Sequence, residues 1–76
     1  MKQTLEFIVK NLVDNKEDVV IEEREDGNFV HLIVTVNPED MGKVIGRNGK
    51  IATAIRVLMR SLAKNQNKRV AVKICE

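Results

Sequence analysis

Two glycines three positions apart enclose a cation and an amide in segment 46–49, Gly-Arg-Asn-Gly, and Lys43 and Lys50 stand on either side of it. Glycine accepts positive φ and lets another backbone approach closely. A helix that begins after such a turn offers free N–H groups and the positive end of its dipole. Arg, Lys and Asn side chains donate hydrogen bonds to phosphate and sugar oxygens. The pattern therefore indicates a site for a phosphodiester backbone.

Two common phosphate loops do not fit this spacing. A P-loop needs a glycine where Val44 stands and a hydroxyl residue where Ile51 stands. The dinucleotide fingerprint GxGxxG fails as well, because Gly42, Gly46 and Gly49 are four and three positions apart. We therefore expect neither a P-loop hydrolase nor a dinucleotide-binding enzyme.

Catalysis and metal binding find little support in the sequence. The chain has one histidine, His31, within a strand pattern, and one cysteine, Cys75, with no evident base beside it. No Cys/His cluster has the spacing of metal ligands. We expect no enzyme, no cofactor and no metal site, with His31 on a sheet surface and Cys75 as a small apolar residue.

Charge is divided unevenly along the chain. Residues 1–40 contain four Lys/Arg and ten Asp/Glu, a formal charge of −6, whereas residues 41–76 contain nine Lys/Arg and one acid, a formal charge of +8. The basic half begins where the glycine segment begins, which favours a polyanionic partner. Attraction between the two halves within the fold explains the charges equally well.

Length and composition favour one small domain, residues 1–76. A domain of this size has modest stability, so pairing with a second subunit would help. A single cysteine forms no internal disulfide, which favours a reducing cytoplasm. Charges interrupt residues 1–18 every few positions, so we expect neither a signal peptide nor insertion into a membrane.

Hydrophobic periodicity predicts the elements of the first half. Helical spacing of apolar residues predicts a helix over about residues 4–14. An extended segment follows from Val19, and the pair Asp26-Gly27 predicts a tight turn into a second strand. One face of that strand is wholly apolar and the other is mixed. The apolar face consists of Val30, Leu32, Val34 and Val36.

The second half predicts two helices and a strand. Segment 37–40, Asn-Pro-Glu-Asp, predicts a helix start with Asn37 as its cap. Gly46 ends this helix after about two turns, and a longer helix runs over about residues 50–64. A strand with alternating apolar residues covers residues 68–75.

These elements predict an α+β fold in the order helix, strand, strand, helix, helix, strand. The first two strands form an antiparallel hairpin. The crossover through the helix pair is long enough to make the last strand parallel to one of them. We therefore expect a three-stranded mixed sheet covered on one face by three helices.

Segment 44–51, Val-Ile-Gly-Arg-Asn-Gly-Lys-Ile, resembles the signature of the KH domain. The order of elements is similar to the type II, prokaryotic arrangement of that fold, and the resemblance covers essentially the whole chain. A free-standing domain of this length resembles the small bacterial RNA-binding members of the family. Ala52 stands where the wider family usually has a branched aliphatic residue. We expect this change to widen or soften one wall of the groove and to leave the backbone clamp intact.

The resemblance implies a groove that holds about four single-stranded nucleotides between the Gly-x-x-Gly turn and a strand edge. The bases would point over an apolar groove lined by Val44, Ile45 and the side chains that follow Gly49. The scarcity of aromatic residues agrees, because other single-strand binders stack bases on aromatic rings. Arg60 and Lys64 lie further along the same helix, on a solvated face or in extended phosphate contact. The expected RNA-binding residues are Lys43, Val44, Ile45, Gly46, Arg47, Asn48, Gly49, Lys50, Ile51 and Arg56.

The same resemblance implies single-stranded RNA as a ligand and pairing of the domain. Its partner would be a second copy, as a homodimer, or a larger KH-domain protein, as a heterodimer. The implied roles are RNA regulation and chaperoning linked to cell-wall growth and division. A footprint of about four nucleotides carries little sequence information, so useful specificity would need a second domain.

Two alternatives stay open at this point. Single-stranded DNA fits the same residues, because nothing in the sequence reads a 2′-hydroxyl. A protein-interaction adaptor built on the KH fold would bind little RNA. Such an adaptor has no reason to keep Arg47 and Asn48 in its turn.

Overall fold

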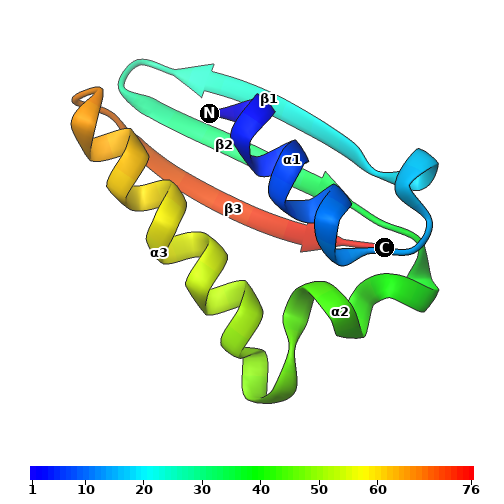
Figure 1. Ribbon diagram of the computed structural model, residues 1–76. Coiled ribbons are helices and arrows are strands. Elements are labelled where there is room, and N and C mark those ends of the chain that lie inside the picture. Colours follow the sequence, from blue (N-terminus) through cyan, green and yellow to red (C-terminus); the bar gives the residue numbers. More distant parts are fainter.

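The computed structural model describes all 76 residues, Met1–Glu76. Its helices and strands in chain order are α1 (Lys2–Leu12), β1 (Val20–Asp26), β2 (Phe29–Thr35), α2 (Met41–Ile45), α3 (Lys50–Asn65) and β3 (Arg69–Cys75). The strands form one sheet in the order β1-β2-β3, with β1 antiparallel and β3 parallel to the central strand. The long helices α1 and α3 lie on the same face of this sheet (Figure 1). The predicted α+β fold and its element order are confirmed.

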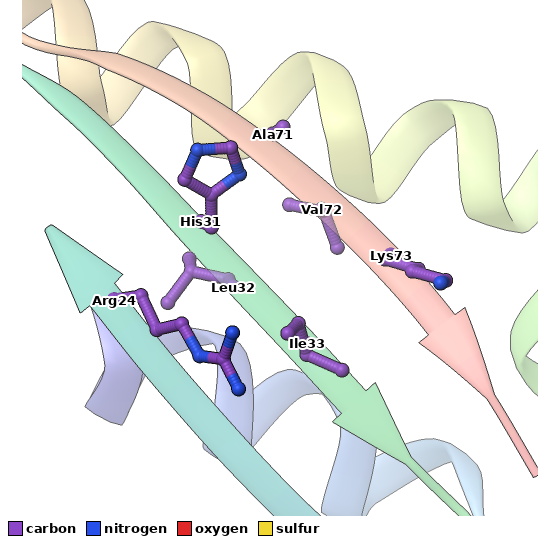
Figure 2. A pocket seen from close by; sticks show the side chains of 7 residues that line it. All are labelled: Arg24, His31, Leu32, Ile33, Ala71, Val72 and Lys73. Atoms are coloured by element: carbon purple, nitrogen blue, oxygen red, sulfur yellow. The ribbon is translucent and has the colours of Figure 1, made fainter. Parts of the chain in front are cut away.

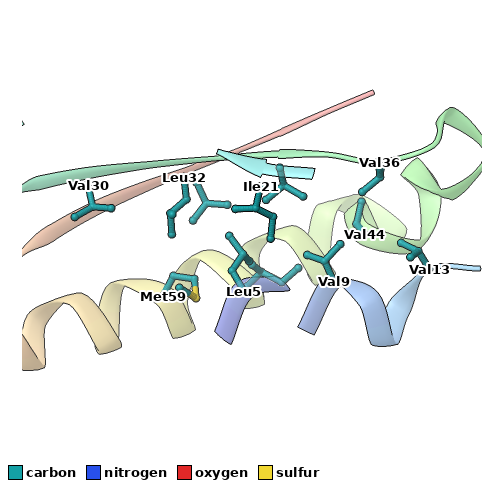
Figure 3. Close-up of a cluster of buried hydrophobic side chains, with 12 residues drawn as sticks. Leu5, Val9, Val13, Ile21, Val30, Leu32, Val36, Val44 and Met59 are labelled. Carbon is teal, nitrogen blue, oxygen red and sulfur yellow. The ribbon is translucent and has the colours of Figure 1, made fainter. Parts of the chain in front are cut away.

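The core lies between the sheet and the helices (Figure 3). Alternate residues of β2 point to this side and are almost fully buried, as the alternation predicted. Burying an aliphatic side chain of this size stabilises the fold by about 1.5–3 kcal/mol. The cluster contains Leu5, Val9, Val13, Ile21, Val30, Leu32, Val34, Val36, Val44, Ile55, Met59 and Val72.

The first helix ends earlier than its apolar spacing predicted. It covers Lys2–Leu12 rather than residues 4–14, and Val13 is extended with φ −98° and ψ 159°. The next two backbone N–H groups, those of Asp14 and Asn15, donate to the carboxylate of Asp40 at 3.3 and 3.0 Å. These tertiary hydrogen bonds replace helical ones, so α1 stops before the apolar pattern does.

The predicted hairpin is confirmed. Asp26 pairs with Phe29, which leaves Gly27 and Asn28 as the two residues of the turn. Gly27 has φ +61°. A positive φ at the first of two turn residues is typical of the turns that match the twist of a hairpin.

The crossover from β2 to β3 passes through both later helices. Asn37 caps its first turn as predicted, since its Oδ1 accepts a hydrogen bond from the backbone N–H of Glu39 at 2.8 Å. The helix α2 has five residues and ends at Ile45, directly before Gly46, and α3 ends at Asn65, one residue beyond the predicted end. None of the helices has the length and hydrophobicity that crossing a bilayer requires.

Candidate nucleic-acid interface

The Gly-x-x-Gly turn joins α2 to α3 at the end of the molecule opposite the β1–β2 turn (Figure 1). Gly46 has φ +77° and ψ 172°, a region open essentially to glycine alone. Asn48 and Gly49 are both left-handed, with φ of +57° and +74°. Asn is several-fold enriched among the non-glycine residues that adopt this conformation. The residue types of the turn therefore match its backbone path.

Gly46 is required for a second reason, which is the close approach of α3. A Cβ atom at this position would lie 2.6 Å from Cγ1 and 2.9 Å from the backbone N of Ile51. A Cβ atom at Gly42 or Gly49 would have nothing within 4 Å. The start of α3 therefore packs directly on the turn, and this contact fixes where the helix N-terminus points.

Two cations at the turn have no carboxylate partner. Arg47 and Lys50 are exposed and form no salt bridge. Lys50 is the first residue of α3, whose first N–H groups have no acceptor within the helix. Asn48 is exposed between the two cations. A phosphate placed over the turn would meet positive side chains and the positive end of a helix dipole together.

Lys43, predicted to contact RNA, is occupied by other groups. Its Nζ pairs with the carboxylate of Asp14 and lies 3.7 Å from Oδ1 of Asp40. The hydrogen bond with Asp14, helped by the charges of both carboxylates, raises the pKa of Lys43 above its ordinary value. Its charge is therefore countered within the protein, and the side chain ties α2 to the segment that follows α1.

Asp40 is a buried carboxylate that the sequence did not reveal. It is 1% exposed and accepts hydrogen bonds from the backbone of Asp14 and from the backbone and side chain of Asn15. Burial alone would raise the pKa of Asp40, but these hydrogen bonds and the charge of Lys43 outweigh it and hold the pKa below its ordinary value. Its partners lie 25 and 26 positions away, so no local pattern could have identified them.

The aliphatic residues that were predicted to line the groove do not lie together in the structure. Val44 is fully buried, so the prediction that its side chain lines a ligand groove is wrong. Val44 is the buried residue of the five-residue helix α2, and its side chain belongs to the hydrophobic core. Ile45 is half-buried at the end of α2. Ile51 lines an apolar hollow of about 350 Å³ between α1 and α3, together with Ile8 and Leu12.

A second groove follows the other side of α3, against the outer edge of β3. Arg56 lies in it and donates from Nε to the carbonyl oxygen of Val72 at 3.1 Å. Hollows of about 250 and 360 Å³ share Arg60 and Val70, and Lys64 lines the second of them. Arg60 and Lys64, whose places the sequence left open, therefore lie along this groove. The groove combines a strand edge with a row of cations.

A three-stranded mixed sheet, helices on one face and a Gly-x-x-Gly turn before the third helix together define a type II KH domain. The family model described as "KhpA/KhpB, KH domain" matches residues 2–74, and the chain belongs to this family. The resemblance that the sequence indicated is therefore confirmed.

Curated relatives match over nearly their full length. "RNA-binding protein KhpA" of Clostridium perfringens is 47% identical over 97% of this chain and 99% of the relative. The protein of the same name from Clostridium acetobutylicum is 49% identical over the same shares of the two chains. That of Halalkalibacterium halodurans is 41% identical over the whole of both chains.

Proposed function

We propose that this protein binds single-stranded RNA without catalysing a reaction, and that it clamps the backbone of about four nucleotides on the Gly-x-x-Gly turn. The observation that carries this proposal is the turn itself. Gly46 has a conformation reserved for glycine and packs against the start of α3, beside the unpaired cations Arg47 and Lys50. The relatives are named RNA-binding proteins, which supports RNA as the ligand.

The charges at the start of α3 support an anionic ligand. Arg47 and Lys50 stand at the positive end of the helix dipole, and the first turn contains no acid. A cation is unfavourable there by about 0.3–1 kcal/mol. A phosphate on the turn reverses this effect, because it interacts favourably with both side chains and with the helix N-terminus. The free protein thus carries a local electrostatic cost that the proposed ligand removes.

The groove between α3 and β3 supports a path for the bound strand across the protein. Its backbone would rest on segment 46–50, and its bases would point toward the edge of β3, where Arg56 already contacts a main-chain carbonyl. Arg60 and Lys64 would meet phosphates further along. Lys43 and Ile51 would act indirectly, since Lys43 positions α2 and Ile51 supports the turn.

Family membership supports the wider role. We propose that the domain acts in the cytoplasm as a homodimer or with a larger KH-domain protein, in RNA regulation and chaperoning linked to cell-wall growth and division. A second domain would compensate for the short footprint, because two linked sites bind with avidity.

The first test is a fluorescence-anisotropy titration of short single-stranded RNA and DNA at two salt concentrations. The test variant is Arg47→Asp with Asn48→Asp, which removes one positive charge and adds two negative charges at the turn. Lys2→Asp with Gln3→Asp is the matched control, since it changes the charge equally at exposed positions of α1. We expect the turn variant to lose about 10- to 100-fold in affinity. The hydrogen-bond donors to phosphate are lost, and the two new carboxylates repel the phosphate. The control should bind as the unaltered protein does.

Circular dichroism makes the result interpretable. Asp tolerates the left-handed conformation of position 48, so the turn variant should keep its fold. Equal binding by a folded turn variant would remove the clamp from the mechanism. Absence of binding by the unaltered protein would favour the adaptor role, and weaker binding of DNA would favour RNA as the natural ligand.

A further inference from the structure

The face of the sheet that the helices leave open carries a pair of aromatic rings. Phe29 and His31 are two positions apart on β2, and their ring centroids lie 4.6 Å apart at an interplanar angle of 35°. Phe29 is half-buried and His31 is exposed. The chain has only two phenylalanines and no Tyr or Trp. This pair is the one contact between aromatic rings in the protein.

A hollow lies beside the pair because β3 presents a small residue there. Ala71 is opposite His31 in the parallel register, and Arg69 and Lys73 are two positions away on either side of it. Residues two apart on a strand are about 7 Å apart. Ala71 thus leaves a gap between two long cationic side chains. The resulting hollow measures about 280 Å³, and Figure 2 shows it among His31, Ile33 and Lys73.

On this face of the sheet, the carboxylates lie on β1 and the unpaired cations lie on β3. The carboxylates of Glu22 and Asp26 are both on β1, where Glu22 holds Arg24 with an N–O distance of 2.8 Å. Arg69 and Lys73 are both on β3 and form no salt bridge. The half of the face between β2 and β3 therefore combines aromatic rings with uncompensated cations.

We propose that this hollow binds one nucleotide unit. Its base would stack on the ring of His31, and its phosphate would lie within reach of Lys73 and Arg69. Stacking platforms flanked by cations hold single-stranded nucleic acid with little sequence preference. The hollow is smaller than a pocket for a drug-sized molecule, which suits a single base. This site is on the face opposite the helices and goes beyond the proposed clamp.

The nucleotide unit has two sources with the same chemistry. It is part of the clamped RNA, or it is a free mononucleotide. Arg69 lines both this face and the far end of the groove between α3 and β3. A strand that leaves the groove at this end can therefore pass the edge of β3 and reach the hollow.

The test is an amide-resolved NMR titration with three probes: adenosine monophosphate, an RNA of four nucleotides and an RNA of twelve nucleotides. The monophosphate should shift the amides of His31, Ala71 and Lys73. These shifts should persist in the variant Arg47→Asp with Asn48→Asp. Chemical shifts at the Gly-x-x-Gly turn with the four-nucleotide RNA test the proposed clamp separately.

The variant for this site is His31→Ala with Lys73→Glu, which changes exposed positions only. Lys2→Glu with Gln3→Ala on α1 is the matched control. We expect at least a tenfold loss of affinity for the monophosphate in the first variant and none in the control. A parallel loss for the twelve-nucleotide RNA, with the four-nucleotide RNA unaffected, identifies the clamped strand as the source. Loss for the monophosphate alone identifies a free nucleotide.

Two outcomes would overturn the site. One is that neither the monophosphate nor the long RNA shifts amides on the open face. The other is that these amides shift with protein concentration and not with nucleotide, which would assign the face to self-association. Failure of the four-nucleotide RNA to bind at the turn would count against the clamp alone, because the monophosphate reports on the open face independently.

Discussion

The chain makes two turns with glycine at positive φ, and it uses glycine differently in each. Gly27, between β1 and β2, has φ +61° and open space where a Cβ atom would lie. Gly46, before α3, has φ +77° and Ile51 within 2.6 Å of that position. Only the backbone angle requires glycine at the hairpin, whereas the angle and the packing both require it before α3. Both turns therefore share a glycine at positive φ. Only the turn before α3 is also held in place by close packing, against Ile51.

The two turns also differ in what anchors them. The β1–β2 turn is held by the pairing of its own strands. The Gly-x-x-Gly turn follows a helix of five residues that is fastened from outside, through Asp40 and Lys43, to the segment after α1. Local interactions are sufficient for the hairpin. The other turn depends on distant residues, so it should respond to changes far from it in sequence.

Gly46→Ala should have the largest effect. The glycine-only backbone conformation and the overlap with Ile51 together predict a loss of roughly 2–6 kcal/mol in the free energy of unfolding. A chain of this length has a total stability of roughly 4–11 kcal/mol. Urea unfolding measures the loss. Gly42→Ala, one helical turn earlier and in open space, is the control and should stabilise α2 by about 0.5–1 kcal/mol. Similar small effects at both positions would contradict the packing of α3 on the turn.

Asp40→Ala should come next. The change leaves the backbone N–H groups of Asp14 and Asn15 without their acceptor and removes a partner of Lys43. We expect the melting temperature to fall by on the order of 10 °C. The melting temperature of Asp40→Asn should fall less, because asparagine keeps one acceptor oxygen. Glu39→Ala is the exposed control and should change little. Equal melting of all three variants would show that the buried carboxylate does not anchor α2.

Gly27→Ala should cost about 1–2 kcal/mol, from the positive φ alone. No neighbouring atom opposes the added methyl group, so the loss should stay below that of Gly46→Ala. Binding of a four-nucleotide RNA should be unchanged, because the hairpin is at the far end of the molecule from the Gly-x-x-Gly turn. A loss at Gly27 equal to that at Gly46 would erase the distinction between the two turns.

Acid should weaken the anchor of the Gly-x-x-Gly turn before it weakens the hairpin. The pKa of Asp40 is lowered in the folded protein, so its contribution to stability is fully present above the unfolded value of about 3.9. That contribution is lost as the pH falls through the lower folded value. Amide exchange between pH 5 and pH 2 should show protection of α2 declining before that of β1 and β2. In Asp40→Asn this order should disappear.

The sequence was sufficient where a pattern is local. Alternation along β2 predicted which side chains are buried, and the turn residues predicted both glycine turns. It was insufficient where a partner is distant. The end of α1 and the burial of Asp40 are one event, since the N–H groups after Val13 bind a carboxylate 25 and 26 positions away.

The candidate site shows the same limit. Its turn could be located from residue types, but the orientation of its neighbours could not. A helix of five residues is too short for periodicity to show that Val44 faces the core. Ile51 lines a hollow that it shares with α1, and Lys43 meets a carboxylate of the segment after α1. Both contacts depend on how segments distant in the sequence pack together.

The contact between Arg56 and Val72 has a consequence for the free protein at high concentration. The strand β3 lies at the edge of the sheet and is rich in Val and Ile, a composition that favours pairing with the edge of another molecule. By donating to the carbonyl oxygen of Val72, Arg56 occupies the middle of this edge and places a charge beside it. Arg56, which we propose to face the bases of a ligand, therefore also opposes aggregation through β-sheet extension.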